Sequence, residues 1–205
     1  MDMAEFIQIK LEDMISELGE NVAKSILSTF SSPNNADVQD FIRNKAIEFS
    51  KQALSKTTLI YWMSEDEKEK YLVGYYTLAN KFLNICQDSI SKTMSKRLFR
   101  HGTYDTSKRI HTIPAILIGQ LSKNFADGNN LLISGSDILQ MALNRIQIIQ
   151  KEIGGKFVFL ECENEPKLIK FYEDNGFVRC GERQRDRDEL GVNGNFLQQM
   201  IMYLH

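Results

Sequence analysis

A polar loop between an apolar run and a long amphipathic stretch is the first place in this sequence where chemistry could occur. The run His111–Ser122 reads HTIPAILIGQLS, which predicts a central strand covered on both faces. The following loop contains Asn129, Asn130 and Gly135, and a helix is predicted directly after it. Such a helix points its free N–H groups and positive dipole end at the loop, which suits a phosphate or diphosphate. The alternative is an ordinary connection between a strand and a helix.

Two carboxylates near the end of another predicted strand are the second candidate for chemistry. Glu161 and Glu163 flank Cys162 in the run KFVFLECE. A carboxylate in this position could take up the proton of an attacking amine, directly or through water. A solvated strand end explains the same residues, so both interpretations stay open.

Metal and covalent chemistry find little support in the sequence. Cys86, Cys162 and Cys180 are odd in number and show no CxxC spacing, so we expect reduced, mostly buried thiols. The three histidines are scattered, and no metal-ligand cluster is predicted. No Ser-His-Asp or Cys-His signature suggests a nucleophilic enzyme.

Composition indicates a folded protein without a strong charge bias. The chain has 205 residues, of which 42% are hydrophobic and 25% charged, with a net charge of −2. This balance argues against a general nucleic-acid binder. The first residues carry acids and lack a signal-like apolar run, and no apolar stretch is long enough to span a membrane. We therefore expect a cytoplasmic protein.

The elements that must position these residues begin with an amphipathic helix. Apolar residues recur every three or four positions from Ala4 to Phe30, with a break expected near Gly19. Residues 31–35 read SSPNN, a composition typical of a loop that ends a helix. This predicts an N-terminal helical extension over 1–33 and one domain over 34–205. A second helix is expected at about residues 37–54, capped by Asn35 or Asp37.

The remaining segments predict an α/β order with antiparallel strands at its start and end. Residues 57–63 and 71–83 form a hairpin across an acidic turn, and residues 88–99 are helical. The strand at 111–122, the helix at 134–153 and the strand at 156–163 form a βαβ unit with parallel strands. A short helix at 166–175 that stops at Gly176 and strands at 177–182 and 196–204 complete the chain.

Several motifs occur in an order that resembles one family. They are VGYYTLA (Val73–Ala79), GQLSKN (Gly119–Asn124), SGSDILQMAL (Ser134–Leu143) and FYEDNGF (Phe171–Phe177). Together, over roughly residues 71–203, they resemble the GNAT superfamily of N-acetyltransferases, with some likeness to its toxin-type members. The resemblance implies a GNAT-like mixed sheet flanked by helices and acetyl-CoA as the cosubstrate.

The resemblance also implies a role for particular positions. Tyr172 would protonate the departing CoA thiolate as a general acid, although a core aromatic is the plain alternative. The role of the family's Asn that follows the strand at 156–163 would fall to Asn164. Apart from the resemblance, Glu163 is the strand-end carboxylate that we name as the candidate base. Backbone amides would bind the acetyl group and pantetheine at one strand end, and the diphosphate at the loop and helix that follow. The first set is Leu121, Ser122 and Lys123, and the second is Asn129, Asn130, Ile133, Ser134, Gly135 and Ser136.

The glycine loop departs from the family pattern, which reads Arg/Gln-x-x-Gly-x-Gly. Aligned on Gly135, the first glycine falls on Ile133 and the Arg/Gln on Asn130. This departure favours a second hypothesis from another class of protein. The chain would then be a catalytically weak or inactive GNAT-fold protein that acts through contacts with other proteins.

A basic stretch precedes the predicted strand at 111–122 and could border the site of the acceptor, and two roles are possible for it. Residues 92–109 contain six Lys and Arg against the single acid Asp105. We prefer a solvated helix face, and contact with an anionic acceptor such as RNA is the alternative. The acceptor would be a small-molecule, peptide or RNA-linked amine. The N-terminal apolar face would pack on the domain's own core or join two copies in a homodimer.

Overall fold

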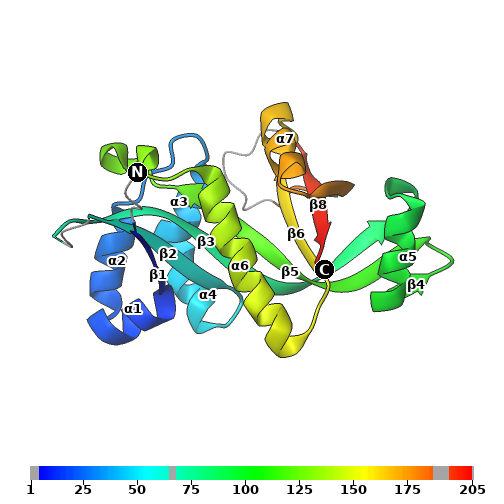
Figure 1. Cartoon of the computed structure of the whole chain (residues 1–205), viewed down its shortest axis with the longest axis horizontal. Helices are drawn as coiled ribbons and strands as arrows, with labels where there is room; N and C mark the ends of the chain where they lie inside the picture. Colours follow the sequence, from blue (N-terminus) through cyan, green and yellow to red (C-terminus); the bar gives the residue numbers. More distant parts are fainter. Residues whose placement is uncertain (1–4, 65–67, 187–193, 205) are drawn as a thin grey trace. The chain divides into compact units, whose positions relative to one another are not determined.

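The computed structural model describes residues 5–64, 68–186 and 194–204, and its strands form one hydrogen-bonded series (Figure 1). The order is β1-β2-β3-β5-β6-β8-β7, with the short β4 paired to β5. The strands are β1 Glu5–Lys10, β2 Lys56–Met63, β3 Lys70–Cys86, β4 Thr103–Asp105, β5 Ile110–Lys123, β6 Phe157–Glu163, β7 Val178–Gln184 and β8 Phe196–Tyr203.

The helices lie between these strands in the order that the sequence predicts. They are α1 Leu11–Leu18, α2 Glu20–Ser28, α3 Ala36–Asp40, the π-helical η1 Phe41–Lys45, α4 Ala46–Lys51, the 3₁₀ turn η2 Gln87–Ser89, α5 Lys92–His101, the 3₁₀ segment η3 Ala126–Leu131, α6 Gly135–Ile153 and α7 Pro166–Asp174. None of them, in the part of the chain that is described, has both the length and the apolar character needed to cross a membrane.

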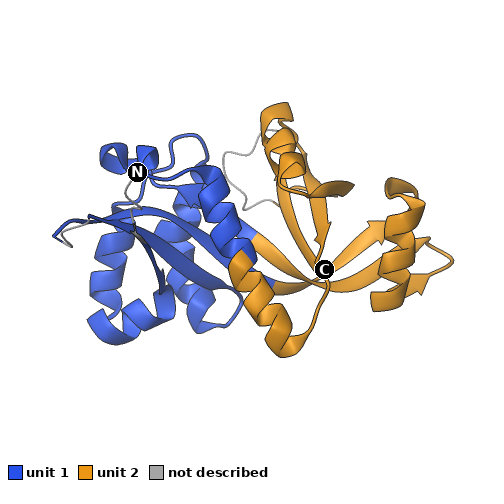
Figure 2. Ribbon diagram, viewed as in Figure 1, with its two compact units in different colours: residues 1–79, 119–143, 190–192 blue, residues 80–118, 144–189, 193–205 orange. Residues whose placement is uncertain are grey.

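The chain divides into two compact units (Figure 2). Of the described residues, unit 1 contains 5–79 and 119–143, and unit 2 contains 80–118, 144–186 and 194–204. Strands β3 and β5 and helix α6 each contribute residues to both units. The predicted division into an extension over 1–33 and a domain over 34–205 stays a prediction.

The N-terminal segment begins with a strand, so the predicted helix from Ala4 onwards is wrong for its first part. Strand β1 pairs antiparallel with β2, from Glu5 opposite Met63 to Lys10 opposite Thr58. Ile7 and Ile9 pack against the core, and this alternation is the period of a strand. Ile7 also fits a helical stripe with Leu11 and Met14, which is why the pattern misleads. The break at Gly19 is confirmed, with φ at 82° between α1 and α2.

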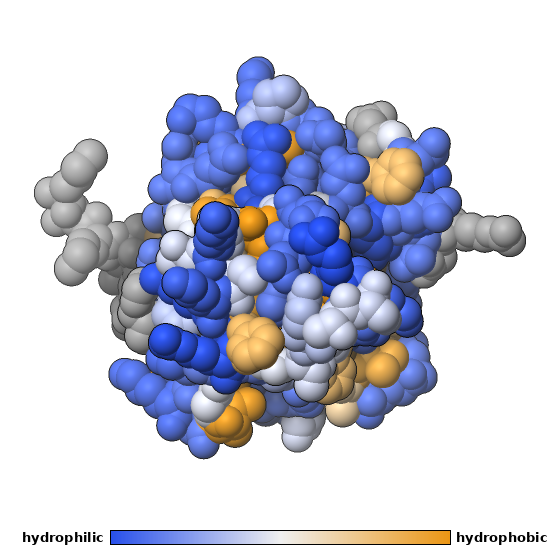
Figure 3. All heavy atoms as spheres, turned by 90° about the vertical axis from the view of Figure 1, so that its right-hand side faces the viewer, coloured by the Kyte–Doolittle hydropathy of each residue, from blue (hydrophilic) through white to orange (hydrophobic). Residues whose placement is uncertain are grey.

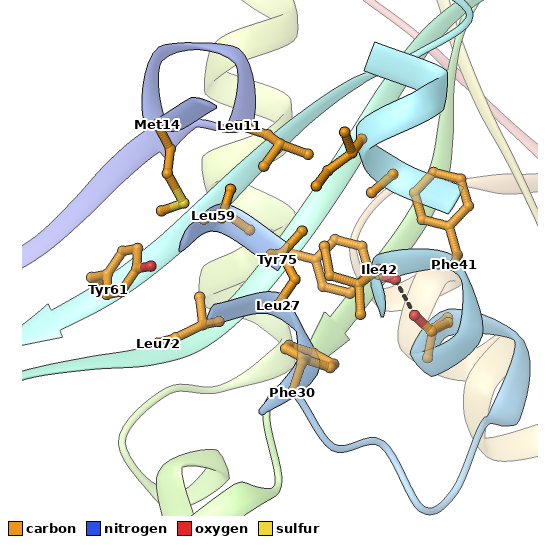
Figure 4. Packing of buried hydrophobic residues seen from close by; sticks show 14 residues of the cluster. Leu11, Met14, Leu27, Phe30, Phe41, Ile42, Leu59, Tyr61, Leu72 and Tyr75 are labelled. Carbon is orange, nitrogen blue, oxygen red and sulfur yellow. Dashed lines mark hydrogen bonds between the residues drawn. The ribbon is translucent and has the colours of Figure 1, made fainter. Parts of the chain in front are cut away.

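The core of unit 1 forms between strands β1 to β3 and the helices of the first fifty residues (Figure 4). Leu11, Leu27 and Phe30 are fully buried in it together with Leu59 and Tyr75. The Tyr75 hydroxyl donates to the Val38 carbonyl at 2.6 Å, a contact drawn as the dashed line in Figure 4. Residues before position 33 therefore supply much of this core.

The second predicted helix is present but divided. Asn35 caps it, because its side chain accepts from the N–H groups of Asp37 and Val38. Its middle, η1, is π-helical, and α4 ends at Lys51. Adjacent Tyr75 and Tyr76 are both fully buried, and the Tyr76 hydroxyl donates to Gln8 at 2.9 Å. Neither ring therefore lines an open cleft.

Unit 2 contains the parallel and antiparallel pairs that the sequence predicts at the end of the chain. Strand β5 pairs parallel with β6, and β8 pairs antiparallel with both β6 and β7. Burial alternates along the first residues of β5, from His111 and Ile113 to Ala115. The expected covering on both faces is thus wrong for this half of the strand. Helix α5 packs Met94 and Leu98 into the unit's own core.

Leu27→Ala should destabilise unit 1 by about 2–5 kcal/mol, because it removes a fully buried side chain and leaves a cavity. Leu18→Ala is the matched control, since Leu18 is 50% exposed and its loss should cost less than about 0.5 kcal/mol. Urea unfolding of both full-length variants measures the difference. Equal stabilities would mean that the N-terminal helices do not belong to the core.

Candidate functional site

The end of β5 presents one edge of its backbone to β3 and the other away from it. The N–H of Asn124, one residue beyond the strand, donates to the Val73 carbonyl at 2.8 Å. Because backbone N–H and C=O groups alternate between the two edges of a strand, Ser122 also faces β3. The N–H groups of Leu121 and Lys123 then point to the opposite edge. Of the three predicted acetyl-binding amides, these two have the direction that a bound group would need.

The close approach of β3 and β5 requires a glycine. A Cβ atom added to Gly74 would lie 2.9 Å from the Ser122 carbonyl oxygen and 2.6 Å from Cδ1 of Ile138. Contacts under 3 Å between such atoms are repulsive, so a side chain here would push the strand end or α6 away. Ser122 is itself buried, and its hydroxyl lies 3.3 Å from that of Ser32.

The loop after β5 is a 3₁₀ segment held by both side chains and main chain. Asp127 and Gly128 have positive φ values of 51° and 78°. The Lys123 ammonium group donates to the Asn130 carbonyl at 2.9 Å, and Asn129 makes a long contact of 3.5 Å to the Leu72 carbonyl. The predicted loop residues thus pack on unit 1 itself, with Asn129 and Asn130 half-buried.

Helix α6 starts with a capping box. The Ser134 hydroxyl accepts from the Asp137 N–H at 3.1 Å, and the Asp137 carboxylate accepts from the Ser134 N–H at 2.9 Å and from its hydroxyl at 2.6 Å. The Ser134 N–H is therefore already satisfied by a carboxylate. Gly135 and Ser136, at the first two helical positions, have N–H groups that cannot bond within the helix. Ile133, just before the helix, is buried, with 4% of the residue exposed.

Tyr172 lies in unit 2 on α7 and is 8% exposed. Its ring makes edge contacts with Phe171 and Phe177 at centroid distances of 5.0 and 5.9 Å. Burial, with a smaller contribution from Cys162, raises the pKa of its phenol well above the ordinary value. Within the described ranges no hydrogen bond is recorded for its hydroxyl.

The two carboxylates near the end of β6, Glu161 and Glu163, are both half-buried. Glu161 accepts from Nε of Arg183 at 2.7 Å and from Nε2 of Gln199 at 2.8 Å, so it belongs to a structural network. Glu163 is half-buried at the strand end, and Asn164 is exposed beside it.

The predicted residues fall into two sets, one in each unit. Tyr172, Glu163 and Asn164 belong to unit 2. Unit 1 brings the others together at the end of β5 and the start of α6, namely Leu121, Ser122, Lys123, Asn129, Asn130, Ile133, Ser134, Gly135 and Ser136.

Three residues of this region were missed in the sequence. Asn124 and Gly74 act through long-range contacts that no local pattern signals. Asp137 could have been found, because Ser-x-x-Asp before an apolar stretch is a capping-box signature. Within the described ranges, no group of three or more His, Cys, Asp or Glu side chains could hold a metal ion.

The basic stretch of unit 2 is exposed along α5. Lys92, Lys96 and Arg100 lie on its surface, and no ion pair is recorded for them among the described residues. Arg97 instead stacks over the Tyr203 ring at 4.5 Å, and Arg109 pairs with Asp88 at 2.7 Å. Figure 3 views the side of the molecule on which α5 lies, where hydrophilic groups predominate and apolar ones are scattered.

Comparison with known proteins finds likeness in structure alone. No protein-family model and no curated protein matches the sequence. Among solved structures, AtaT complexed with acetyl-methionyl-tRNAfMet has a TM-score of 0.60 and 16% identity, covering 95% of this chain and 94% of that one. A Tyr-to-Phe mutant of KacT has a TM-score of 0.61 and 15% identity, covering 95% and 94%.

A further match is AtaTR bound with AcCoA, with a TM-score of 0.56 and 16% identity over 97% of this chain and 93% of that one. At these identities the likeness shows the fold. The chain has the GNAT-like fold of these toxins, as the sequence predicted.

The phenol of Tyr172 should stay protonated in the folded chain where a free tyrosine, with a pKa of about 10, ionises. The pKa of Tyr172 is higher in the folded chain than in the unfolded chain. The buried, neutral phenol therefore contributes its full share to the free energy of unfolding below pH about 10, and this contribution is lost as pH rises further. The difference in tyrosinate absorbance between the chain and its Tyr172→Phe variant measures this. We expect the folded chain and the folded variant to show the same tyrosinate absorbance change near pH 10. In urea, the parent chain should show the ionisation of one more tyrosine than the variant. Ionisation of folded Tyr172 at its ordinary pKa would contradict the burial.

Proposed function

We propose that this chain is an acetyl-CoA-dependent N-acetyltransferase. The observation that carries the proposal is the pair of outward N–H groups at the end of β5, next in sequence to a loop and a helix start with free N–H groups, all in unit 1. The fold likeness to AtaTR, which was solved bound with AcCoA, supports the same cosubstrate here. A strand edge suits the acetyl and pantetheine amides, and a helix start suits the diphosphate.

The proposed chemistry needs no covalent intermediate on the protein. A neutral amine attacks the thioester carbonyl, and the N–H groups of Leu121 and Lys123 stabilise the oxyanion. The C–S bond breaks while the new C–N bond stays, the leaving sulfur takes up one proton and the nitrogen loses one. The sequence resemblance assigns the proton donor to Tyr172, and Glu163 is the candidate acceptor of the nitrogen's proton; exchange with solvent then restores both side chains. The amine thus loses one proton and the thiol gains one.

The acceptor that we propose to test first is an amine carried on RNA. AtaT was solved with acetyl-methionyl-tRNAfMet, and Lys92, Lys96 and Arg100 form an exposed basic surface on α5 of this chain. Lysine and arginine side chains of this kind attract phosphate groups at low salt. Small-molecule and peptide amines are the other acceptors to be assayed. Homodimer formation stays a separate proposal.

Tyr172→Phe should lower kcat at least roughly tenfold while acetyl-CoA binding stays within about twofold, because only the proton donor is removed. Thiol release from acetyl-CoA, followed with charged tRNA, peptide and small amines, measures turnover. Calorimetry measures binding. Tyr104→Phe is the matched control, since Tyr104 belongs to the same unit but lies on β4 beside His111. No thiol release with any acceptor by a chain that is folded would remove the enzyme proposal, and unchanged kcat would remove Tyr172 from its role.

A non-catalytic, partner-binding protein is the second candidate, and Asp137 is the observation that favours it. Its carboxylate already accepts a hydrogen bond from the Ser134 N–H at the start of α6, so this N–H is not available to a ligand. It also places a negative charge where the diphosphate of acetyl-CoA would lie. If acetyl-CoA does not raise the unfolding temperature even at millimolar concentration, this second function is favoured.

Asp137→Asn should therefore strengthen acetyl-CoA binding by roughly two- to fivefold, the size of a charge effect at a helix terminus. An asparagine can still accept from Ser134, so the cap largely survives. Asp13→Asn, in the first turn of α1, is the control and should not change binding. The gain should shrink as salt is raised. Equal affinity of the Asp137→Asn variant and the parent chain would mean that the diphosphate binds elsewhere.

A further inference from the structure

Asn124 has the most completely satisfied buried side chain near the candidate site. It is 1% exposed. Its Oδ1 accepts from the N–H groups of Ser31 at 2.9 Å and Ala126 at 3.1 Å, and its Nδ2 donates to the Leu72 carbonyl at 2.8 Å. One side chain thus joins three stretches of unit 1, which are the segment after α2, strand β3 and the start of the loop.

Further bonds tie the same stretches together around Asn124. The Phe125 N–H donates to the Ser31 carbonyl at 2.7 Å, so both backbone groups of Ser31 bond to residues 124 and 125. Gln120 donates to the Asp37 carboxylate at 3.0 Å. The end of β5 is therefore hydrogen-bonded both to residues 31–37 and to β3.

We propose that Asn124 is a positioning residue for the acetyl-CoA site, a role that rests on the proposed function. It touches no substrate atom itself. It sets the course of the backbone from Leu121 to Lys123, and so the direction of the two N–H groups that bind the thioester. Donors to a developing oxyanion stabilise it only when they are already held in place.

An asparagine is the side chain that this position requires. The site offers two N–H donors and one carbonyl acceptor to a buried group, and a neutral amide supplies both an acceptor oxygen and a donor nitrogen. An aspartate keeps the acceptor but loses the donor, and it buries a charge opposite the Leu72 carbonyl. A leucine of similar size loses both and leaves the Ser31 and Ala126 N–H groups without a partner.

A purely stabilising role would predict a different result, and Leu27→Ala separates the two. Leu27 is fully buried in the core of the same unit, and its apolar side chain has no hydrogen bond to give to the end of β5. A variant that only loses stability should keep the affinity of the parent chain for acetyl-CoA, provided that binding is measured well below its unfolding temperature.

The experiment compares Asn124→Leu, Asn124→Asp and Leu27→Ala in the full chain. Calorimetry gives the acetyl-CoA Kd, and amide hydrogen exchange is followed without ligand at Phe125, whose N–H donates to the Ser31 carbonyl. We expect Asn124→Leu to bind roughly tenfold or more weakly, Asn124→Asp to fall between it and the parent chain, and Leu27→Ala to stay within about twofold. Exchange at Phe125 should accelerate in the Asn124 variants only.

The proposal is overturned if Asn124→Leu resembles Leu27→Ala in both affinity and exchange. Should Asn124→Leu fail to fold, Asn124→Asp decides by the same two measurements. Failure of the proposed function is distinguishable, because the parent chain itself would then not bind acetyl-CoA. The exchange rates would still show whether Asn124 holds the strand end.

Discussion

The backbone at the end of β5 must find partners for polar groups that are buried away from water, and this constraint shapes unit 1. An unsatisfied buried N–H or C=O costs roughly 1–3 kcal/mol, so several such groups would offset much of a domain's stability. Asn124 resolves three of them with one side chain. A strand end held by its own satisfied hydrogen bonds is rigid, and rigidity is what a binding edge of backbone donors requires.

The same constraint explains why the first residues of the chain are part of unit 1. The carbonyl and N–H of Ser31 are partners of Phe125 and Asn124, so the segment after α2 completes the hydrogen bonding of the central strand. Strand β1 then covers the edge of β2, and the Tyr76 hydroxyl reaches Gln8 across the sheet. Apolar burial and polar satisfaction thus act together on this segment.

Local patterns in the sequence predicted most elements and failed where long-range partners decide. The hairpin β2–β3, the parallel pair β5–β6 and the break at Gly19 all follow from apolar period and glycine placement. Strand β1 did not, because Ile7, Leu11 and Met14 fit a helical stripe and only pairing with β2 selects the extended form. The site divides in the same way. The loop after β5 and the start of α6 were found by their order and residue types, as anion sites usually are. Asn124 and Gly74 were not found, because each acts through a partner far away in the sequence. Asn124 donates to the Leu72 carbonyl, and Gly74 lies against the Ser122 carbonyl.

The capping box at α6 sets how strongly an anion can be held there. The Asp137 carboxylate removes one donor and adds a repulsion of about 0.3–1 kcal/mol. Two N–H groups remain at Gly135 and Ser136, and a hydrogen bond to a charged acceptor is worth about 1.5–3 kcal/mol. The remaining attraction exceeds the repulsion, so a self-capped helix weakens a diphosphate site without abolishing it. Under the proposed function, more of the acetyl-CoA affinity must therefore come from the strand edge, and the hydrogen bonds that hold β5 become correspondingly more important.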